Sequence, residues 1–296
     1  GTNGAGKTTT ISILCGEQMP THGRAYVDDF DVVDEALDAQ RHIGYCPQFD
    51  ALLDLLTPQE HLQLYAGLRG IPADEQEGVI DTLMSVCGLY EHKDTVAMNL
   101  SGGNKRKLSV ALALVGGPLV VFLDEPSAGM DPVARRGLWE VINDISAHCS
   151  VVLTTHHLEE VEALAHRVAI MVDGQMMCIG DKTHLKNKFG SGFEMQIRVN
   201  TEDAVDELAD YVTENIPDAI LSEYRSLKFH YELPPDTKLS SVFGELEAMK
   251  IKLGITDYAV QQTSIESVFL RISSSADGAE EDTKVQKENV APADAA

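Results

Sequence analysis

The first eight residues, GTNGAGKT, fill every fixed position of the phosphate-binding pattern G-x-x-x-x-G-K-[ST]. In such a loop, consecutive backbone N–H groups surround an anion and the following helix directs its positive end toward it. Gly4 and Gly6 permit a positive φ angle and a close approach of the main chain. Lys7 can place its ammonium against terminal phosphates, and the Thr8 hydroxyl can bind Mg²⁺. The alternative is a chance glycine-rich turn. The predicted nucleotide-binding residues are Gly1, Thr2, Asn3, Gly4, Ala5, Gly6, Lys7, Thr8 and Thr9.

Other polar residues follow apolar stretches further along the chain. In VVFLDEP, Asp124 occupies a position suited to Mg²⁺ coordination, and Glu125 can polarise a water for attack on a γ-phosphate. Without a phosphate-binding loop, two carboxylates that only cap a strand would be the better interpretation. Gln48 in YCPQFD can touch both Mg²⁺ and the attacking water, although a surface glutamine is the default interpretation. His156 ends the run VVLTTH, where it could reach the γ-phosphate, whereas we assign no role to His157.

A second glycine turn, in LSGGNKRKLS, precedes a helix with regularly spaced apolar residues. Ser101, Gly102 and Gly103, followed by Asn104, would form another anion-binding site at a helix N-terminus. Because one chain needs only one cradle for its own nucleotide, we expect this turn to serve the nucleotide of a neighbouring copy. The alternative is an ordinary glycine loop that caps a helix. In PSAGMDP, Asp131 is expected to cap the helix that starts at the next proline.

Residues 1 to about 190 alternate short apolar strands with helical patterns, which predicts an α/β fold. A helix is expected to leave the phosphate-binding loop and end at Gly16. Another is expected in TPQEHLQLYAGLRG, with Thr57 and Glu60 as a capping box and Gly70 as the stop. LVVFLDEP and SVVLTTH have the composition of buried parallel strands whose carboxyl ends carry a site. RVAIMVDGQMMCIG predicts a hairpin that turns at Asp173–Gly174.

The pattern changes near residue 193 and predicts a small α+β domain of the ferredoxin-like type over residues 193–275. The preceding domain would then cover residues 1–192, and the polar tail over residues 276–296 is expected to be disordered. The expected order is strand (Glu194–Val199), helix (Thr201–Asn215), strand (Ala219–Arg225), strand (Leu227–Leu233), helix (Ser240–Lys252), strand (Asp257–Gln262) and a final helix (Ser264–Ile272).

The composition excludes several classes of protein. A formal charge of −24 over 296 residues argues against nucleic acid as the main partner. The five cysteines form no C-x-x-C pair, so neither a disulfide framework nor a zinc site is indicated, and a reducing cytosolic setting fits best. The longest apolar stretch is broken by Gly-Gly-Pro and falls short of the roughly 20 residues that a membrane span needs. No signal peptide is present, so a membrane role would depend on a partner or on further sequence.

Taken in order, these motifs resemble the ATP-binding cassette family over the first ~165 residues. LSGGNKRKLSVALALVGGPLVVFLDEPSAGMDPVARR resembles subfamily A, the large eukaryotic lipid exporters, and Asn104 resembles their second cassette in particular. VAIMVDGQMMCIGDKTHLKNKFGSGF and DYAVQQTSIESVFLRIS also resemble the stretch that follows that cassette, where the family carries a regulatory domain. The matching segments are the P-loop (Gly1–Thr8), the glutamine loop (Gln48), the signature (Leu100–Asn104), the Asp-Glu strand (Asp124, Glu125), the D-loop (Asp131) and the histidine switch (His156).

The resemblance implies an ATPase that powers membrane transport, with ATP and Mg²⁺ as cofactors and a lipid as the transported substrate. Two cassettes would face head to tail and hold each ATP between one P-loop and the opposite signature turn. Glu125 would be the general base, His156 would hold the γ-phosphate and water, and Asp131 would communicate across the pair. Gln48 would report nucleotide state and, with Thr8 and Asp124, hold Mg²⁺. Transmembrane domains would contact the segment just after Gln48, on the cytosolic face of a membrane.

The chain lacks the strand that precedes the P-loop in this family, the upstream aromatic residue that stacks on adenine, and every transmembrane segment. We therefore expect a chain cut at the loop from a longer transporter, and slow ATP hydrolysis by these 296 residues alone. Two other functions remain open on the sequence. One is a nucleotide-gated regulatory module that rarely hydrolyses ATP, and the other is a detached ATPase subunit that pairs with a separate permease.

Overall fold

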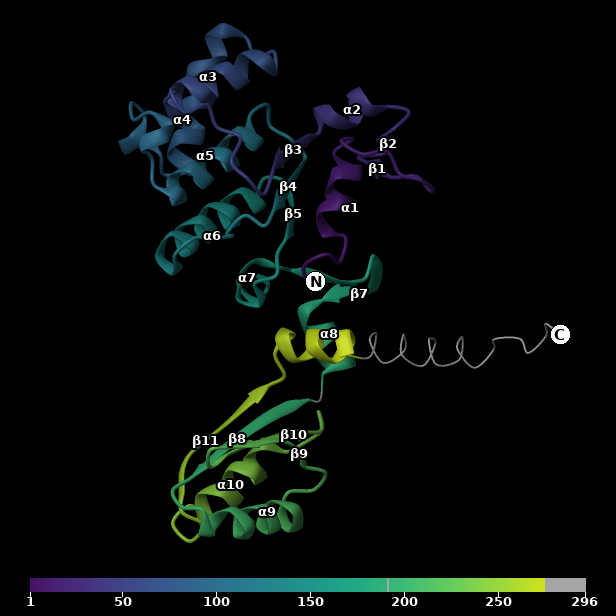
Figure 1. The fold of residues 1–296 in the computed structure, drawn as a ribbon, viewed down its shortest axis with the longest axis vertical. Helices are drawn as coiled ribbons and strands as arrows, with labels where there is room; N and C mark the ends of the chain where they lie inside the picture. The colour runs from purple at the N-terminus through teal and green to yellow at the C-terminus, as the bar shows by residue number, and fades with distance from the viewer. Residues whose placement is uncertain (191, 275–296) are drawn as a thin grey trace, which may run out of the picture. The chain divides into compact units, whose positions relative to one another are not determined.

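The computed structural model describes residues 1–190 and 192–274, so the predicted disordered tail lies outside the described residues (Figure 1). The chain divides into two compact units. Unit 1 comprises Gly1–Ala165 and Met171–Gln175, and unit 2 comprises His166–Ile170 and the described residues from Met176 onward. The domain boundary expected between residues 192 and 193 remains a prediction.

A three-stranded parallel sheet forms the centre of unit 1, in the order β3 (Ile43–Cys46), β4 (Val120–Asp124) and β5 (Ser150–Thr154). Because the strands are parallel, their carboxyl ends meet at one edge, as the polar residues after VVFL and VVLT predict. The expectation of a buried strand holds for β4 but is wrong for β5, where Val152 is 43% exposed. Within the described residues β5 is an edge strand of this sheet, which leaves one of its sides uncovered.

Side chains of β4 alternate between two hydrophobic cores, as the two-residue period of a strand requires. Val121 and Leu123 pack in the core that contains α5 (Gly102–Leu114) and α6 (Pro132–Ser146). Phe122 packs instead in the core formed with α1 (Lys7–Leu14), the helix that follows the phosphate-binding loop. Asp124 has the same parity as Phe122, so the strand directs its side chain to the α1 face.

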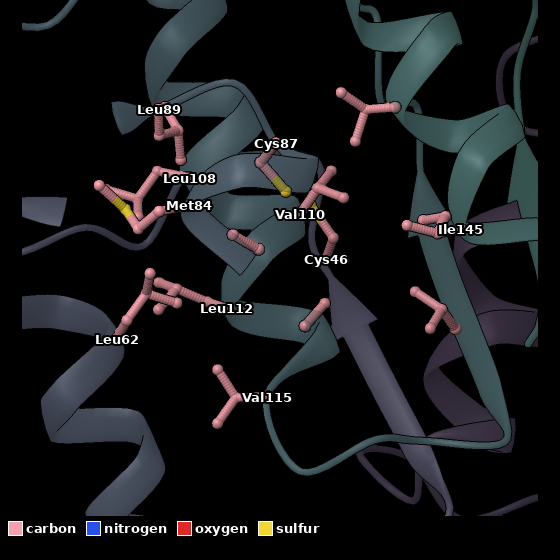
Figure 2. Close-up of a cluster of buried hydrophobic side chains, with 14 of the residues drawn as sticks. Cys46, Leu62, Met84, Cys87, Leu89, Leu108, Val110, Leu112, Val115 and Ile145 are labelled. Atoms are coloured by element: carbon pink, nitrogen blue, oxygen red, sulfur yellow. The ribbon is translucent and has the colours of Figure 1, made fainter. Parts of the chain in front are cut away.

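The larger core of unit 1 joins α5 to α3 (Pro58–Leu68) and α4 (Ala73–Val86), as Figure 2 shows. Leu62 of α3, Met84 of α4 and Leu108 of α5 are almost fully buried there. Each such side chain contributes roughly 1.5–3 kcal/mol relative to an exposed position. This packing holds α5 rigidly against the sheet. Helix α4 and the short strand β3 were not predicted from the sequence.

Helix α3 begins with the predicted capping box. The Thr57 hydroxyl accepts from the Glu60 backbone N–H at 3.2 Å, and the Glu60 carboxylate accepts from the Thr57 N–H at 2.8 Å. Gly70, with φ of 75°, follows the end of the helix in the left-handed conformation. Both ends of α3 are therefore set by local chemistry that the sequence displays.

The remaining elements up to residue 190 are short. The β6–β7 hairpin turns at Asp173 and Gly174, both with positive φ, as predicted. Within the described parts of the chain, no helix is both long and apolar enough to cross a membrane. The elements are β1 (Tyr26–Val27), β2 (Phe30–Asp31), α2 (Ala36–Arg41), two 3₁₀ turns (Tyr90–His92 and Ala97–Asn99), α7 (Leu158–Leu164), β6 (Arg167–Val172), β7 (Gln175–Asp181) and α8 (Lys182–Phe189).

Unit 2 contains an antiparallel sheet in the order β11-β8-β10-β9, with its own hydrophobic core. Strand, helix, strand, strand, helix, strand is the ferredoxin-like order that the sequence predicts, and the observed boundaries differ from the predicted ones by at most three residues. A helix over residues 265–274 follows. The elements are β8 (Phe193–Val199), α9 (Asp203–Asn215), β9 (Ile220–Arg225), β10 (Lys228–Leu233), α10 (Leu239–Met249) and β11 (Ile255–Gln262).

Candidate functional site

The glycine-rich loop enters α1 without any side-chain cap. Gly6 is the N-cap residue with φ of 93°, and Gly4 has φ of 80°, so both adopt the left-handed conformation that favours glycine. The first N–H groups of a helix have no intrahelical partner. Because no side chain satisfies the start of α1, these donors suit an anion such as a phosphate.

The Lys7 side chain lies between the loop and the carboxyl end of the sheet. Its Nζ donates to the carbonyl oxygens of Gly1, at 3.0 Å, and Thr2, at 3.1 Å. The same Nζ is 3.3 Å from Oε1 of Glu125. The Lys7 side chain is only 12% exposed and that of Glu125 only 7%, so water screens this ion pair weakly.

Glu125 links the loop to the end of β5. Its second carboxylate oxygen, Oε2, accepts from Nδ1 of His156 at 2.8 Å and from the His156 backbone N–H at 3.3 Å. Glu125 has φ of 46°, a conformation that is rare for a residue with a side chain. Such strain concentrates at functional sites, where the surrounding structure holds it in place. Lys7, Glu125 and His156, singled out separately in the sequence, thus form one contiguous cluster.

Asp124 is fully buried at the end of β4. Its Oδ1 accepts a short hydrogen bond from the Thr154 hydroxyl, whereas its Oδ2 has no hydrogen-bond partner among the described residues. A buried anionic oxygen without a partner is costly, and a cation would satisfy it. Burial raises the pKa of the Cys15 thiol and of the Tyr45 phenol to about 12 each, and the Asp124 carboxylate adds to this effect.

These residues fit Mg²⁺. No group of three or more His, Cys, Asp or Glu side chains suited to a metal ion occurs in the described ranges. Mg²⁺ in nucleotide sites takes only one or two carboxylates, and phosphates and waters complete its shell. Asp124, through its unpartnered oxygen, would be one ligand, and the exposed hydroxyl of Thr8 at the start of α1 would be a second.

Gln48 follows the end of β3, and its side chain is exposed. Its main chain is held firmly, because the Gln48 carbonyl accepts from the Arg106 guanidinium at 3.3 Å. No hydrogen bond in the described residues joins the Gln48 side chain to Asp124 or Glu125. Its assignment as a Mg²⁺ ligand therefore remains a prediction.

The glycine turn before α5 is exposed at Ser101 and Gly102, whereas Gly103 and Asn104 are half-buried. Ser101 is the N-cap residue, and its hydroxyl accepts from the Asn104 N–H at 3.2 Å. A Cβ atom on Gly103 would lie 3.0 Å from that of Ala134 in α6, so this glycine permits close packing of the two helix starts. Asp131 caps α6 as predicted, accepting from the N–H groups of Val133 and Ala134 at 3.0 Å each. The signature turn and the Asp131 cap therefore form neighbouring parts of one surface.

Two residues in the site have no counterpart in the sequence prediction. The Thr154 hydroxyl donates to Asp124 and accepts from the Glu125 N–H at 3.1 Å, so it orients both carboxylate residues. Arg106 donates to the carbonyl oxygen of Asp124 at 2.8 Å. The position of Thr154 at the end of an apolar strand, two residues before His156, is the signal that could have identified it. Arg106 offers none, because charged residues are common on helices.

Comparison with sequence families gives two matches. The profile of the ABC transporter family matches residues 1–128, and that of the ABCA1-like C-terminal R1 regulatory domain matches residues 190–262. The first range includes the glycine-rich loop, the signature turn and the two carboxylates of the site. The second covers most of the ferredoxin-like sheet.

Curated relatives match most of this chain but only a small part of their own length. The human ATP-binding cassette sub-family A member 2 is 45% identical over 275 residues, which cover 92% of this chain and 11% of the relative. The mouse phospholipid-transporting ATPase ABCA3 is 46% identical over 275 residues, covering 91% and 16%. The rat ATP-binding cassette sub-family A member 7 is 46% identical over 277 residues, covering 92% and 13%.

Two solved structures share the fold. The ATP-binding subunit of an ABC transporter has a TM-score of 0.57 at 28% identity, covering 64% of this chain and 79% of that one. A dimeric post-hydrolysis state of the ATP-binding cassette MJ0796, bound to ADP and Pi, has a TM-score of 0.54 at 22% identity. That alignment covers 61% of this chain and 82% of the other.

Proposed function

Because the chain carries an ATP-binding cassette domain and an R1 regulatory domain and so belongs to subfamily A of the ATP-binding cassette family, we propose that unit 1 binds and hydrolyses MgATP to power a membrane transporter. The observation that carries this proposal is the contact of Lys7 and His156 with the two oxygens of Glu125. Asp124, next to it, keeps one buried oxygen without a partner.

Each residue of the cluster has a role in the proposed reaction. The α1 N-terminus and Lys7 bind the phosphates, so Lys7 must exchange its contact with Glu125 for one with the nucleotide. This exchange frees Glu125 to accept a proton from the attacking water. His156, which donates from Nδ1 to Glu125, holds the carboxylate in place and faces the γ-phosphate. Mg²⁺, when bound with ATP, would neutralise charge on the phosphate oxygens.

We propose that the signature turn, Ser101–Asn104, completes the nucleotide site of an opposing cassette. Three features support this interpretation: Ser101 and Gly102 are exposed, the turn begins a helix of 13 residues, and it adjoins the Asp131 cap. Such a turn offers N–H donors to an anion from outside the chain. Asp131 would then lie at the interface between the two cassettes.

The transmembrane partner would contact the segment after Gln48. Phe49 is 80% exposed and Leu55 is 78% exposed, and both lie within a few residues of a loop tied to the site. A partner surface would remove these large apolar side chains from water. The ABCA3 relative is named a phospholipid-transporting ATPase, so we propose a phospholipid as the substrate and the cytosolic face of a membrane as the location. The R1-like unit would regulate this ATPase.

Two substitutions test the proposal. Lys7→Ala should abolish saturable binding of a fluorescent ATP analogue with Mg²⁺, because it removes the positive charge beside the phosphates. Lys250→Ala is the matched control, since Lys250 lies in unit 2, where it pairs with Glu247 and lies over the Tyr258 ring. Unchanged affinity in Lys7→Ala would contradict the proposed phosphate site.

Glu125→Gln tests the catalytic step separately. Loss of a positioned general base typically slows turnover by about 10²–10⁴-fold, whereas ATP should still bind. Single-turnover hydrolysis is the measurement, with Glu140→Gln on the exposed face of α6 as the control for loss of a carboxylate. Parental turnover by Glu125→Gln would exclude Glu125 as the base.

A further inference from the structure

Arg106 is the most heavily bonded buried cation in the described part of unit 1, and neither the fold nor the proposed reaction explains it. It lies in the second turn of α5 and is 5% exposed. Its guanidinium donates to four main-chain carbonyls and one carboxylate: those of Pro47, Gln48, Asp124, Pro126 and Asp50.

These acceptors belong to two different segments. Pro47, Gln48 and Asp50 form the loop that leaves β3, which we call the glutamine loop (residues 47–50). Asp124 and Pro126 flank Glu125 at the end of β4. One side chain from the helix that starts at the signature turn therefore holds the segments of two of the three predicted Mg²⁺ ligands, Gln48 and Asp124, but not that of Thr8.

A second contact fastens the same loop to the same helix. Oδ1 of Asp50 accepts from Nη1 of Arg106 at 3.1 Å and from the Ser109 hydroxyl at 2.8 Å. Arg106 and Ser109 are three positions apart, so they lie on one face of α5. The Asp50 carboxylate is also the ion-pair partner of the guanidinium.

The chemistry of the contact requires arginine. A guanidinium presents five N–H donors in a fixed planar fork and stays charged, so it can bond in several directions at once. A lysine offers one ammonium at the end of a flexible chain and cannot span carbonyls from two segments. Arg106→Lys therefore keeps the charge and removes the bridge.

We propose that Arg106 is a positioning residue that links the signature helix to the Mg²⁺ ligands of the same chain. The inference rests on the proposed function of unit 1. Through Arg106, the position of α5 sets where the glutamine loop and the end of β4 lie. Contact of the signature turn with an opposing nucleotide would thereby alter the placement of Gln48 and Asp124.

The test measures the Mg²⁺ requirement of nucleotide binding in the full chain, which does not depend on turnover. A fluorescent ATP analogue is titrated in EDTA and then at increasing Mg²⁺. Substitution of residues that orient metal ligands typically lowers metal affinity by 10–100-fold, so Arg106→Lys should raise the half-saturating Mg²⁺ concentration by about tenfold. Affinity in EDTA should change by less than about twofold, because Arg106 contacts no phosphate-binding residue of the loop. Asp50→Asn and Ser109→Ala should shift the Mg²⁺ requirement in the same direction by less.

Arg69→Lys is the matched control. Arg69 also bridges main-chain carbonyls, those of Gln40 at 3.2 Å and Ile43 at 2.8 Å, but at the amino end of β3, away from the ligands. The substitution Arg69→Lys should lower the melting temperature of the protein without changing the Mg²⁺ requirement of nucleotide binding. If Arg106→Lys behaves like Arg69→Lys, Arg106 is structural and the inference is wrong.

Two further outcomes are decisive. Should Arg106→Lys fail to fold, an unchanged Mg²⁺ requirement in Asp50→Asn and Ser109→Ala would overturn the inference by itself. If the parental chain binds no nucleotide, the proposed function fails and the inference fails with it. If the parental chain binds MgATP and Arg106→Lys leaves the half-saturating Mg²⁺ concentration unchanged, the proposed function stands and only the positioning role is rejected.

Discussion

At the scale of single residues, the site depends on the buried Glu125 carboxylate, which forms an ion pair with Lys7 and a hydrogen bond with His156. Glu125 faces Lys7 at 3.3 Å and His156 at 2.8 Å. The carboxylate of Asp124, one residue earlier, accepts a hydrogen bond only from the Thr154 hydroxyl among the described residues and keeps one buried oxygen without a partner. Adjacent carboxylates in these two environments are suited to different tasks, one as a base and one as a metal ligand.

Thr154 supports both carboxylates with one hydroxyl, and this leads to a prediction. Thr154→Val preserves the shape of the side chain but removes the donor to Asp124 and the acceptor for the Glu125 N–H. The Glu125 N–H keeps the Thr154 carbonyl as an acceptor at 3.1 Å, whereas Oδ1 of the buried Asp124 loses its hydrogen bond. An unsatisfied buried polar group costs about 1–3 kcal/mol, so we expect lower stability and slower single-turnover ATP hydrolysis.

Thr154→Ser is the control for this prediction, because it retains the hydroxyl. It should recover most of the turnover that Thr154→Val loses. Equal turnover by the Val variant and the parent would show that the hydroxyl does not position the carboxylates.

At the scale of elements, the starts of α5 and α6 lie side by side, since Gly103 leaves room for Ala134. Each start is capped by its own side chain, Ser101 in α5 and Asp131 in α6. Caps of this kind fix where a helix begins and therefore where its N–H donors point. The surface that would meet an opposing cassette is thus built by local hydrogen bonds.

Asp131 allows the role of a cap to be separated from a role between cassettes. Asp131→Ala should lower the free energy of unfolding by about 1 kcal/mol, because two N–H groups lose their acceptor. Asp131→Asn should restore stability in urea titrations, since asparagine caps as well as aspartate. If Asp131→Asn is as unstable as Asp131→Ala, the cap does not explain the contribution of Asp131. If Asp131→Asn is as stable as the parent but hydrolyses ATP more slowly, the negative charge of Asp131 has a separate role in the pairing of two cassettes.

At the scale of the whole molecule, the two units have separate cores that contain different titratable groups. In unit 1, burial raises the pKa of the Cys46 and Cys87 thiols to about 12. In unit 2, burial raises the pKa of the Tyr231 phenol to about 12. The ordinary values of these groups are 9.0 for the thiols and 10.0 for the phenol.

Unit 1 contains more buried thiols than unit 2 and should therefore lose more stability between pH 9 and pH 10. Between pH 9 and about 12 the unfolded chain releases the thiol protons while the folded chain keeps them. The stability contributed by these thiols is thus complete below pH 9 and falls as the pH rises, by up to about 1.4 kcal/mol per pH unit for each group. In unit 2 the loss from the Tyr231 phenol begins near pH 10, and only the Cys178 thiol, whose pKa burial also raises from 9.0, contributes at lower pH among the described thiols.

Urea unfolding at several pH values measures this difference. The chain has a single tryptophan, Trp139 in α6, so its fluorescence follows unit 1. Cys87→Ala should reduce the slope of unit 1 stability against pH above pH 9. A fluorescence midpoint that is constant from pH 8 to pH 10.5 would contradict the prediction.

Local patterns in the sequence were sufficient to predict much of this protein. The glycine spacing of the phosphate loop, the capping box at Thr57, the Asp131 cap and the turn at Asp173–Gly174 all depend on residues a few positions apart. Strand and helix order in unit 2 was predictable for the same reason, because hydrophobic period distinguishes the two. The motifs also indicated which residues to expect at the carboxyl edge of the sheet.

Only the tertiary structure decided how these residues meet. The Lys7 contact with Glu125 joins residues more than a hundred positions apart in the sequence. Each local pattern joins residues only a few positions apart. The roles of Thr154 and Arg106 depend on which strand lies beside β4 and which helix packs on it. Strand β5 is half exposed because no further strand in the described residues covers it. Sequence spacing determines neighbours along the chain, whereas burial and long-range packing determine neighbours across it.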